Sequence, residues 1–150
     1  MGEDNKNLPL VLITDDNVQV VELLKRFFEK AKERGDLNCN VIDAAHGAKA
    51  IELILKETPD IVLCDIHMPG KDGFEVLDDF NSICKDQIPF CYFAFLTGDQ
   101  EERARAFQSG AMGFISKTEI NYFVFTLQIK TWLRLVELER AEEIRKLELL

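Results

Sequence analysis

Residues 60–73 read DIVLCDIHMPGKDG, and this stretch decides the fold. Its first part, Asp60 to Cys64, is a short apolar run of the kind that forms a strand buried on both faces of a parallel sheet. A carboxylate, Asp65, follows directly, and Gly70 and Gly73 then mark the connection to the next element. The stretch therefore predicts a buried strand that ends in an acid and is followed by a loop.

Short apolar runs of this kind alternate with helix-like segments five times along the chain. The four other strand candidates are Leu10 to Thr14, Cys39 to Ala44, Phe90 to Leu96 and Gly113 to Ser116. Apolar residues at helical spacing predict five helices. Their expected buried stripes are Val21, Leu24, Phe28 and Ala31; Ala48, Ile51 and Leu55; Phe74, Leu77 and Phe80; Ala104, Phe107 and Ala111; and Ile120, Phe123, Leu127 and Thr131.

This alternation predicts an α/β protein with a doubly wound, five-stranded parallel sheet covered by helices. The strand order that we expect is 2-1-3-4-5, which makes the fold flavodoxin-like. In that order the first and third strands are neighbours at the point where the strand order reverses.

The composition is that of a soluble folded protein, with 47% hydrophobic and 30% charged residues. The net charge of -9 disfavours direct binding to nucleic acid. The polar start of the chain lacks the apolar region of a signal peptide, and no stretch approaches the ~20 apolar residues of a membrane span. We therefore expect a cytoplasmic protein without membrane insertion.

The cysteines show neither C-x-x-C spacing nor a partnering histidine, so we expect reduced thiols packed in the interior and no zinc site. They are Cys39, Cys64, Cys84 and Cys91.

The charged tail contains no turn signal, so the fifth helix is expected to run on past the sheet, with pairs such as Glu142 and Lys146 supporting it. We place one domain at residues 8–136 and a helical extension or linker stub at residues 137–150. A solvated helix end and a homodimer contact are both compatible with this tail. The dimer would use a short coiled-coil seam of residues three or four apart, which Arg140 interrupts: Leu133, Val136, Arg140, Ile144 and Leu147.

Polar residues stand at the C-terminal ends of the predicted strands, where ligands bind in open parallel sheets. Each residue alone has an ordinary explanation as a cap, strand or surface residue. Five such groups at one end of the sheet are improbable as independent caps. Three close carboxylates also repel one another and form an oxygen-rich site that a hard divalent ion such as Mg²⁺ relieves. The residues are Asp15, Asp16, Asp65, Thr97 and Lys117.

Four segments, within residues 10 to about 133, resemble the receiver domains of response regulators in two-component signal transduction. The pattern D-x-x-M-P-G-x-D-G in the second segment is highly specific, whereas a pair of acids after a strand is a weak signal alone. The segments are Ile13 to Asn17, Asp65 to Gly73, Leu96 to Asp99 and Gly113 to Lys117.

The resemblance implies a signalling switch that accepts a phosphoryl group on Asp65. It implies no enzyme in the usual sense, because such a domain catalyses only its own phosphorylation and dephosphorylation. The implied cofactor is Mg²⁺, or Mn²⁺, held by Asp15, Asp16, Asp65 and the backbone carbonyl of His67.

The resemblance also implies that Thr97 and Lys117 bind the phosphoryl oxygens, and that Phe114 is the aromatic residue whose position reports phosphorylation. The implied partners are a histidine kinase or a histidine phosphotransfer protein and, downstream, a protein target or a fused output domain.

Three positions have more than one interpretation. Most family members follow the lysine with a cis-proline, but Thr118 stands here, and a cis bond to a non-proline residue costs about 3 kcal/mol. The loop is therefore trans or strained, and Thr118 is a candidate cap of the fifth helix. His67 either tunes dephosphorylation or is a surface histidine. Asp99 either orients the hydrolytic water or caps the fourth helix together with Glu102, and we favour the cap.

Two other functions compete with the signalling switch. An aspartate-nucleophile phosphohydrolase of the haloacid-dehalogenase type would need a second acid two residues after the nucleophile, where this chain has His67. A pseudo-receiver interaction module, which no longer accepts phosphate, is disfavoured because the set of acids, threonine and lysine is complete. The sequence leaves open whether the receiver stands alone or belongs to a larger protein.

Overall fold

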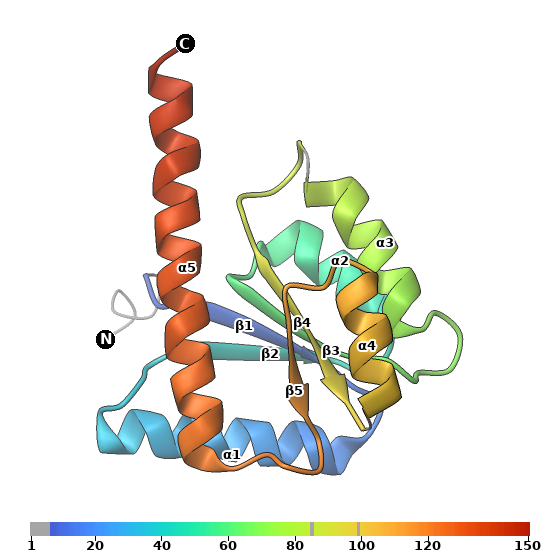
Figure 1. Ribbon diagram of the computed structural model, residues 1–150. Coiled ribbons are helices and arrows are strands. Elements are labelled where there is room, and N and C mark those ends of the chain that lie inside the picture. Colours follow the sequence, from blue (N-terminus) through green and yellow to red (C-terminus); the bar gives the residue numbers. More distant parts are fainter. Residues whose placement is uncertain (1–6, 85, 99) are drawn as a thin grey trace.

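The computed structural model describes residues 7–84, 86–98 and 100–150, which form five parallel strands and five helices (Figure 1). The strands are β1 (Leu10–Thr14), β2 (Asn40–Ala44), β3 (Ile61–Asp65), β4 (Tyr92–Thr97) and β5 (Gly113–Ser116). The helices are α1 (Val18–Arg34), α2 (Gly47–Glu57), α3 (Gly73–Cys84), α4 (Gln100–Gln108) and α5 (Tyr122–Glu148). The strand order β2-β1-β3-β4-β5 confirms the predicted fold.

The helices form one layer on each face of the sheet (Figure 1). Helices α1 and α5 share one hydrophobic cluster with β1, β3 and β4, and α2, α3 and α4 share the other. Every residue of β3 and β4 is buried because these strands lie inside the sheet between both layers. The continuous apolar runs in the sequence follow from this position.

The buried face of α2 differs from the predicted stripe, which was wrong by one position. Gly47, Ala50 and Ile54 are buried, whereas Ala48 and Leu55 are exposed. The cause lies in the packing of α2 against α3. A Cβ atom on Gly47 would lie 2.7 Å from Val76 Cγ2 and 2.9 Å from the Lys71 carbonyl oxygen. The glycine therefore faces inward, where its small size allows close contact.

The predicted stripes of α4 and α5 were also wrong at several positions, although Ala111 and Ile120 pack against the core. Among the residues of α4 whose burial is described, Ala106 is buried, while Ala104 and Phe107 are exposed. In α5 the exposed residues include Phe123 and Leu127, because apolar residues occur on both faces of this helix. Its buried face consists of Tyr122, Phe125, Thr126, Ile129, Trp132, Leu133 and Val136.

Helix α5 runs past the sheet, as the sequence predicted, and its C-terminal end projects beyond the sheet (Figure 1). The coiled-coil seam, one of the two alternatives for this tail, does not include Leu133 and Val136, because both are buried in the core of their own domain. Arg140 is also engaged, through hydrogen bonds to Asp60, Pro59 and Phe90. The ion pair in the projecting part joins Glu142 to Arg145.

The aromatic residues Tyr92 and Trp132 join β4 to α5. Their rings stack with centroids 4.6 Å apart, and the Tyr92 hydroxyl donates a 2.8 Å hydrogen bond to the Met112 carbonyl. Gly113 permits this arrangement, because a Cβ atom there would lie 2.6 Å from the Tyr92 hydroxyl and 3.0 Å from Trp132 Cζ2. The single tryptophan of the chain thus lies directly against the first residue of β5.

The four cysteines are free thiols, as predicted. Cys64 and Cys91 are buried, and burial raises the pKa of the half-buried Cys39 to about 12 and that of Cys84 to about 11. Among the helices formed by the described residues, none is long and apolar enough to cross a bilayer.

Candidate functional site

The predicted carboxylates lie together at the C-terminal edge of the sheet. Asp15 directly follows β1, and Asp65 is the last residue of the neighbouring strand β3. One carboxylate oxygen from each of Asp15, Asp16 and Asp65 lies within 4.8 Å of the others. Asp15 and Asp65 are buried, whereas Asp16 is exposed. Because all the donors are acidic oxygens, the cluster fits a hard divalent cation such as Mg²⁺.

The turn from β1 into α1 explains the positions of the first two acids. The Asp15 N–H donates to the Ala44 carbonyl at 3.1 Å, which continues the pairing of β1 with β2. Asp15 Oδ1 accepts a 2.9 Å hydrogen bond from the Asn17 N–H, and the Asn17 side chain caps α1 by accepting from the Gln19 N–H. The capping turn therefore fixes the buried acid and leaves Asp16 at the surface.

Lys117 joins two of the carboxylates. Its Nζ donates a 2.8 Å hydrogen bond to Asp65 Oδ1 and lies 2.9 Å from Asp15 Oδ2. Its backbone N–H donates to the Thr97 carbonyl at 2.8 Å and so extends the pairing of β5 with β4. Burial alone lowers the pKa of Lys117, but the attraction of Asp15 and Asp65 outweighs it and the pKa is raised. The ammonium group therefore stays charged and neutralises part of the cluster.

The surroundings of Asp65 disfavour its ionised form. Burial raises the pKa of the Asp65 carboxyl above its ordinary value of 3.8, and the negative charges of Asp15 and Asp16 act in the same direction. The hydrogen bond from Lys117 opposes this rise. Positive charge brought to these oxygens favours ionised Asp65, the form that acts as a nucleophile.

Thr97 ends β4 beside the last residue of β3. In the register of the two strands, Asp65 lies opposite Leu96, the residue before Thr97. Thr97 is fully buried, and its Oγ1 makes no hydrogen bond within the described part of the chain. A buried hydroxyl without a partner has a donor to offer to a group that enters the site.

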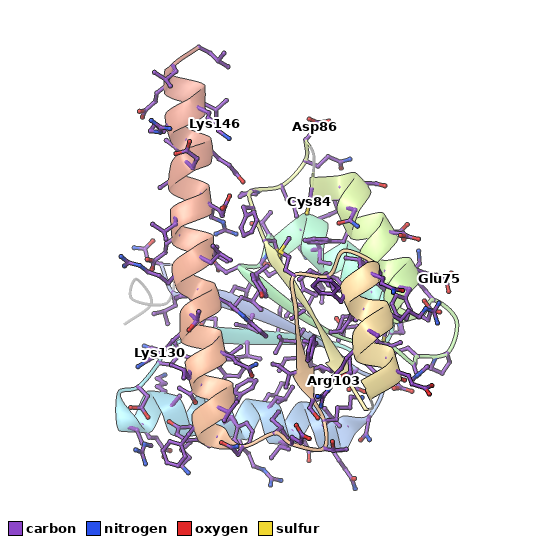
Figure 2. All side chains as sticks on the ribbon, viewed as in Figure 1. Glu75, Cys84, Asp86, Arg103, Lys130 and Lys146 are labelled. Carbon is purple, nitrogen blue, oxygen red and sulfur yellow. The ribbon has the colours of Figure 1, made fainter. Side chains whose placement is uncertain are left out.

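Phe114 lies on β5, opposite Phe95 and outside the carboxylate cluster, with 37% of its surface exposed. Arg103 of α4, labelled in Figure 2, places its guanidinium carbon 5.5 Å from the centroid of the Phe114 ring. The same guanidinium group lies 3.5 Å from the Glu119 carboxylate. Phe114 is thus half-exposed beneath an arginine of the neighbouring helix.

The side chain of His67 is 75% exposed, and its Nε2 contacts Oε1 of Glu102. Oε2 of Glu102 accepts a 3.1 Å hydrogen bond from the Gly98 N–H. Sequence reasoning identified Glu102 only as a capping partner and missed its contact with His67. Asp99, the expected cap, lies outside the described residues.

The Lys117–Thr118 peptide is trans, since no cis bond occurs in the described residues. Thr118 was a wrong candidate for the cap of α5. Asn121 caps this helix, and its Oδ1 accepts a 3.0 Å hydrogen bond from the Val124 N–H.

The family match and the similar proteins agree with one another. Residues 11–122 match the family described as the response regulator receiver domain. The chain is 30% identical over 107 residues to the chemotaxis protein CheY of Halobacterium salinarum, a match that covers 71% of this chain and 82% of that protein.

Two solved structures show the same fold. A CheY-like receiver domain protein from Methanospirillum hungatei superposes with a TM-score of 0.74 at 24% identity, over 89% of this chain and 99% of that one. The chemotaxis protein CheY4 of Vibrio cholerae superposes with a TM-score of 0.65 at 26% identity, over 85% and 98% of the two chains.

Proposed function

Because the chain belongs to the response regulator receiver domain family, we propose that it is a phosphoacceptor switch of a two-component or phosphorelay system. The phosphoryl group would be carried by Asp65. The observation that supports this assignment is the position of Asp65, buried at the end of β3 between two further acids and the ammonium group of Lys117.

The proposed transfer makes one bond and breaks one. A carboxylate oxygen of ionised Asp65 attacks the phosphorus of a phosphohistidine on a kinase or phosphotransfer protein. As the new O–P bond forms, the N–P bond breaks, and its electron pair returns to the imidazole, which then takes up a proton. Attack of water on phosphorus later breaks the bond between the Asp65 oxygen and phosphorus, releases inorganic phosphate and restores the Asp65 carboxylate. The domain thus accepts and releases the phosphoryl group on its own side chain.

The cation site would consist of Asp15, Asp16, Asp65 and the backbone carbonyl of His67. Bound Mg²⁺, or Mn²⁺, supplies positive charge that offsets the repulsion between these acids and the incoming phosphoryl oxygens.

Lys117 and Thr97 would hold the remaining phosphoryl oxygens. Lys117 provides a point charge, and the Thr97 hydroxyl provides the donor that has no other partner within the described residues. Movement of Thr97 toward the phosphoryl group would then allow Phe114 to change position. A protein target or a fused output domain would recognise the altered surface, in the cytoplasm.

The experiment that tests the proposal is incubation of the purified protein with Mg²⁺ and a small acyl phosphate, followed by intact-mass measurement at acid pH. Wild-type protein should gain about 80 Da, one phosphoryl group. Asp65→Asn should gain nothing, and Asp78→Asn, which changes an exposed acid of α3, should behave as wild type. No gain in the wild type, with Mg²⁺ binding confirmed separately, would instead support a pseudo-receiver.

A further inference from the structure

Glu102, the third residue of α4, turns its carboxylate back toward the edge of the sheet that carries the proposed phosphoryl site. Its two oxygens contact the Gly98 N–H, at 3.1 Å, and His67 Nε2. The carboxylate therefore joins the loop after β4 to the loop after β3. Only 17% of the Glu102 side chain is exposed, against 75% for His67.

Both contacts are made directly beside residues of the site. Gly98 follows Thr97, and His67 lies two residues after Asp65. A backbone N–H in a loop that leads into a helix binds the oxygens of a phosphoryl group as well as those of a carboxylate. The buried Thr97 hydroxyl, which has no partner in the described part of the chain, is a second donor next to this N–H. A carboxylate thus already occupies one of these two neighbouring donors.

This inference rests on the proposed phosphorylation of Asp65. We propose that Glu102 is an internal competitor of the phosphoryl group for the Gly98 N–H. In the unphosphorylated protein the Glu102 carboxylate occupies this donor. A phosphoryl group on Asp65 takes the donor over, and its negative charge repels Glu102 from the site.

Release of Glu102 has a consequence for α4. The Glu102 carboxylate, at the third helical position, accepts a hydrogen bond from the N–H of Gly98 in the preceding loop and so holds the first turn of α4 against the loop after β4. Phosphorylation therefore removes this contact and loosens the first turn of α4. Glu102 is in this sense a positioning residue, which couples occupancy of the site to the order of a helix.

The test is a titration with beryllofluoride, a stable mimic of a phosphoryl group, in the presence of Mg²⁺. Glu102→Gln removes the charge and keeps the shape, and Glu102→Ala removes the carboxylate. Both variants should bind beryllofluoride about threefold to tenfold more tightly than the wild type, since no charge-assisted hydrogen bond has to be displaced. The matched control is Glu101→Gln, which removes the same charge one position away and should change the dissociation constant less than about twofold.

Amide hydrogen exchange of residues 103–106 gives a second readout. In the wild type, protection of these amides should fall when beryllofluoride binds, whereas in Glu102→Ala it should be low before and after binding. If Glu102 only stabilises the first turn and does not compete, Glu102→Ala should show lower protection with an unchanged or higher dissociation constant, which would overturn the proposal. If Glu102→Ala fails to fold, the dissociation constant of Glu102→Gln is compared with that of the wild type instead.

The titration also separates this inference from the function on which it rests. Binding to the wild type but not to Asp65→Asn, with no change in Glu102→Gln, would overturn the competition alone. Absence of binding to the wild type, or equal binding to Asp65→Asn, would overturn the phosphoacceptor assignment and the competition together.

Discussion

Arg140 and Asp60 form an ion pair at the beginning of the strand that ends in Asp65, with Nη1 2.7 Å from Oδ1. The other oxygen of Asp60 accepts a 2.7 Å hydrogen bond from the Leu10 N–H. Arg140 also donates to the Phe90 carbonyl at 2.8 Å, and the Phe90 N–H donates to Glu143. Through these contacts the far half of α5 holds the starts of β1, β3 and β4. We therefore propose that the folded unit extends to Glu143, past the boundary at residue 136 that the sequence suggested.

Replacement of Arg140 by methionine should destabilise the domain by about 1–3 kcal/mol, because it leaves the half-buried Asp60 carboxylate and two carbonyl groups with fewer partners. Urea denaturation followed by circular dichroism measures this difference. The control is Arg134→Met, since Arg134 is 74% exposed and lies 3.9 Å from Glu137. That variant should lose less than about 0.5 kcal/mol. Equal losses in the two variants would contradict the structural role of Arg140.

Asp65 should lower the stability of the metal-free protein as the pH rises. Its pKa is raised in the folded state above the ordinary 3.8. At pH values between the ordinary and the raised pKa, the folded protein therefore binds more protons than the unfolded chain. The free energy of unfolding must then fall as the pH rises from about 4 through the raised pKa. Asp65→Asn should consequently melt at a higher temperature than the wild type at pH 7 in EDTA, and should lose this advantage below pH ~4.

Thermal melts at several pH values check this dependence. Asp78→Asn, at an exposed position, serves as the control and should show no comparable gain. An Asp65→Asn protein that is less stable than the wild type at neutral pH would show that the hydrogen bond from Lys117 outweighs the burial of the acid.

Replacement of Lys117 by methionine should tighten Mg²⁺ binding while it impairs phosphorylation. The ammonium group now contacts two of the three carboxylates that would hold the cation, and its charge repels a divalent ion. We expect the dissociation constant for Mg²⁺ to fall at least about threefold, as measured by isothermal titration calorimetry. Lys25→Met, which removes an exposed lysine paired with Asp43, should leave it unchanged. Weaker binding in Lys117→Met would mean that the lysine organises the acids instead of competing with the ion.

Gly73→Ala should be strongly destabilising because a Cβ atom there would lie 2.4 Å from the Asp65 carbonyl oxygen and 2.8 Å from Ile66 Cα. Both atoms belong to the backbone and cannot move without disturbing the end of β3. We expect a loss of more than about 2 kcal/mol in the free energy of unfolding. Gly98→Ala is the matched comparison, since a Cβ atom at Gly98 meets none of the described atoms within 4 Å. A similar loss in both variants would show that chain flexibility, and not steric contact, sets the effect.

The strands could be predicted because they depend on short local patterns, and their order because it is the one expected of a flavodoxin-like fold. The buried run that leads to Asp65 has no polar residue to suggest another element, and parallel strands bring their C-terminal ends to one edge. The grouping of Asp15, Asp65 and Lys117 follows from this rule alone.

The helix faces were harder to predict because apolar residues occupy adjacent positions. In α5, Phe123 and Phe125 are equally hydrophobic, yet only Phe125 is buried, against Phe28 of α1. In α2 the decisive residue is Gly47, whose inward position depends on the backbone of the loop before α3. Hydrophobic spacing does not contain this information.

The long-range contacts of Glu102 and Arg140 had no local signal. Glu102 contacts a residue 35 positions away, and Arg140 one that is 80 positions away. The sequence indicated only a capping role for Glu102 and a charge in the helical tail for Arg140. Only the folded chain shows that these charges meet partners on other elements.

The contact of Trp132 with β5 gives the protein an optical reporter of its own. The indole is the only one in the chain, and it stacks on the Tyr92 ring and lies beside Gly113, the residue before Phe114. A displacement of β5 changes the surroundings of this single fluorophore. Emission from the unlabelled protein can therefore be followed in real time in a stopped-flow instrument, with no need to attach a dye to the surface that a partner would bind.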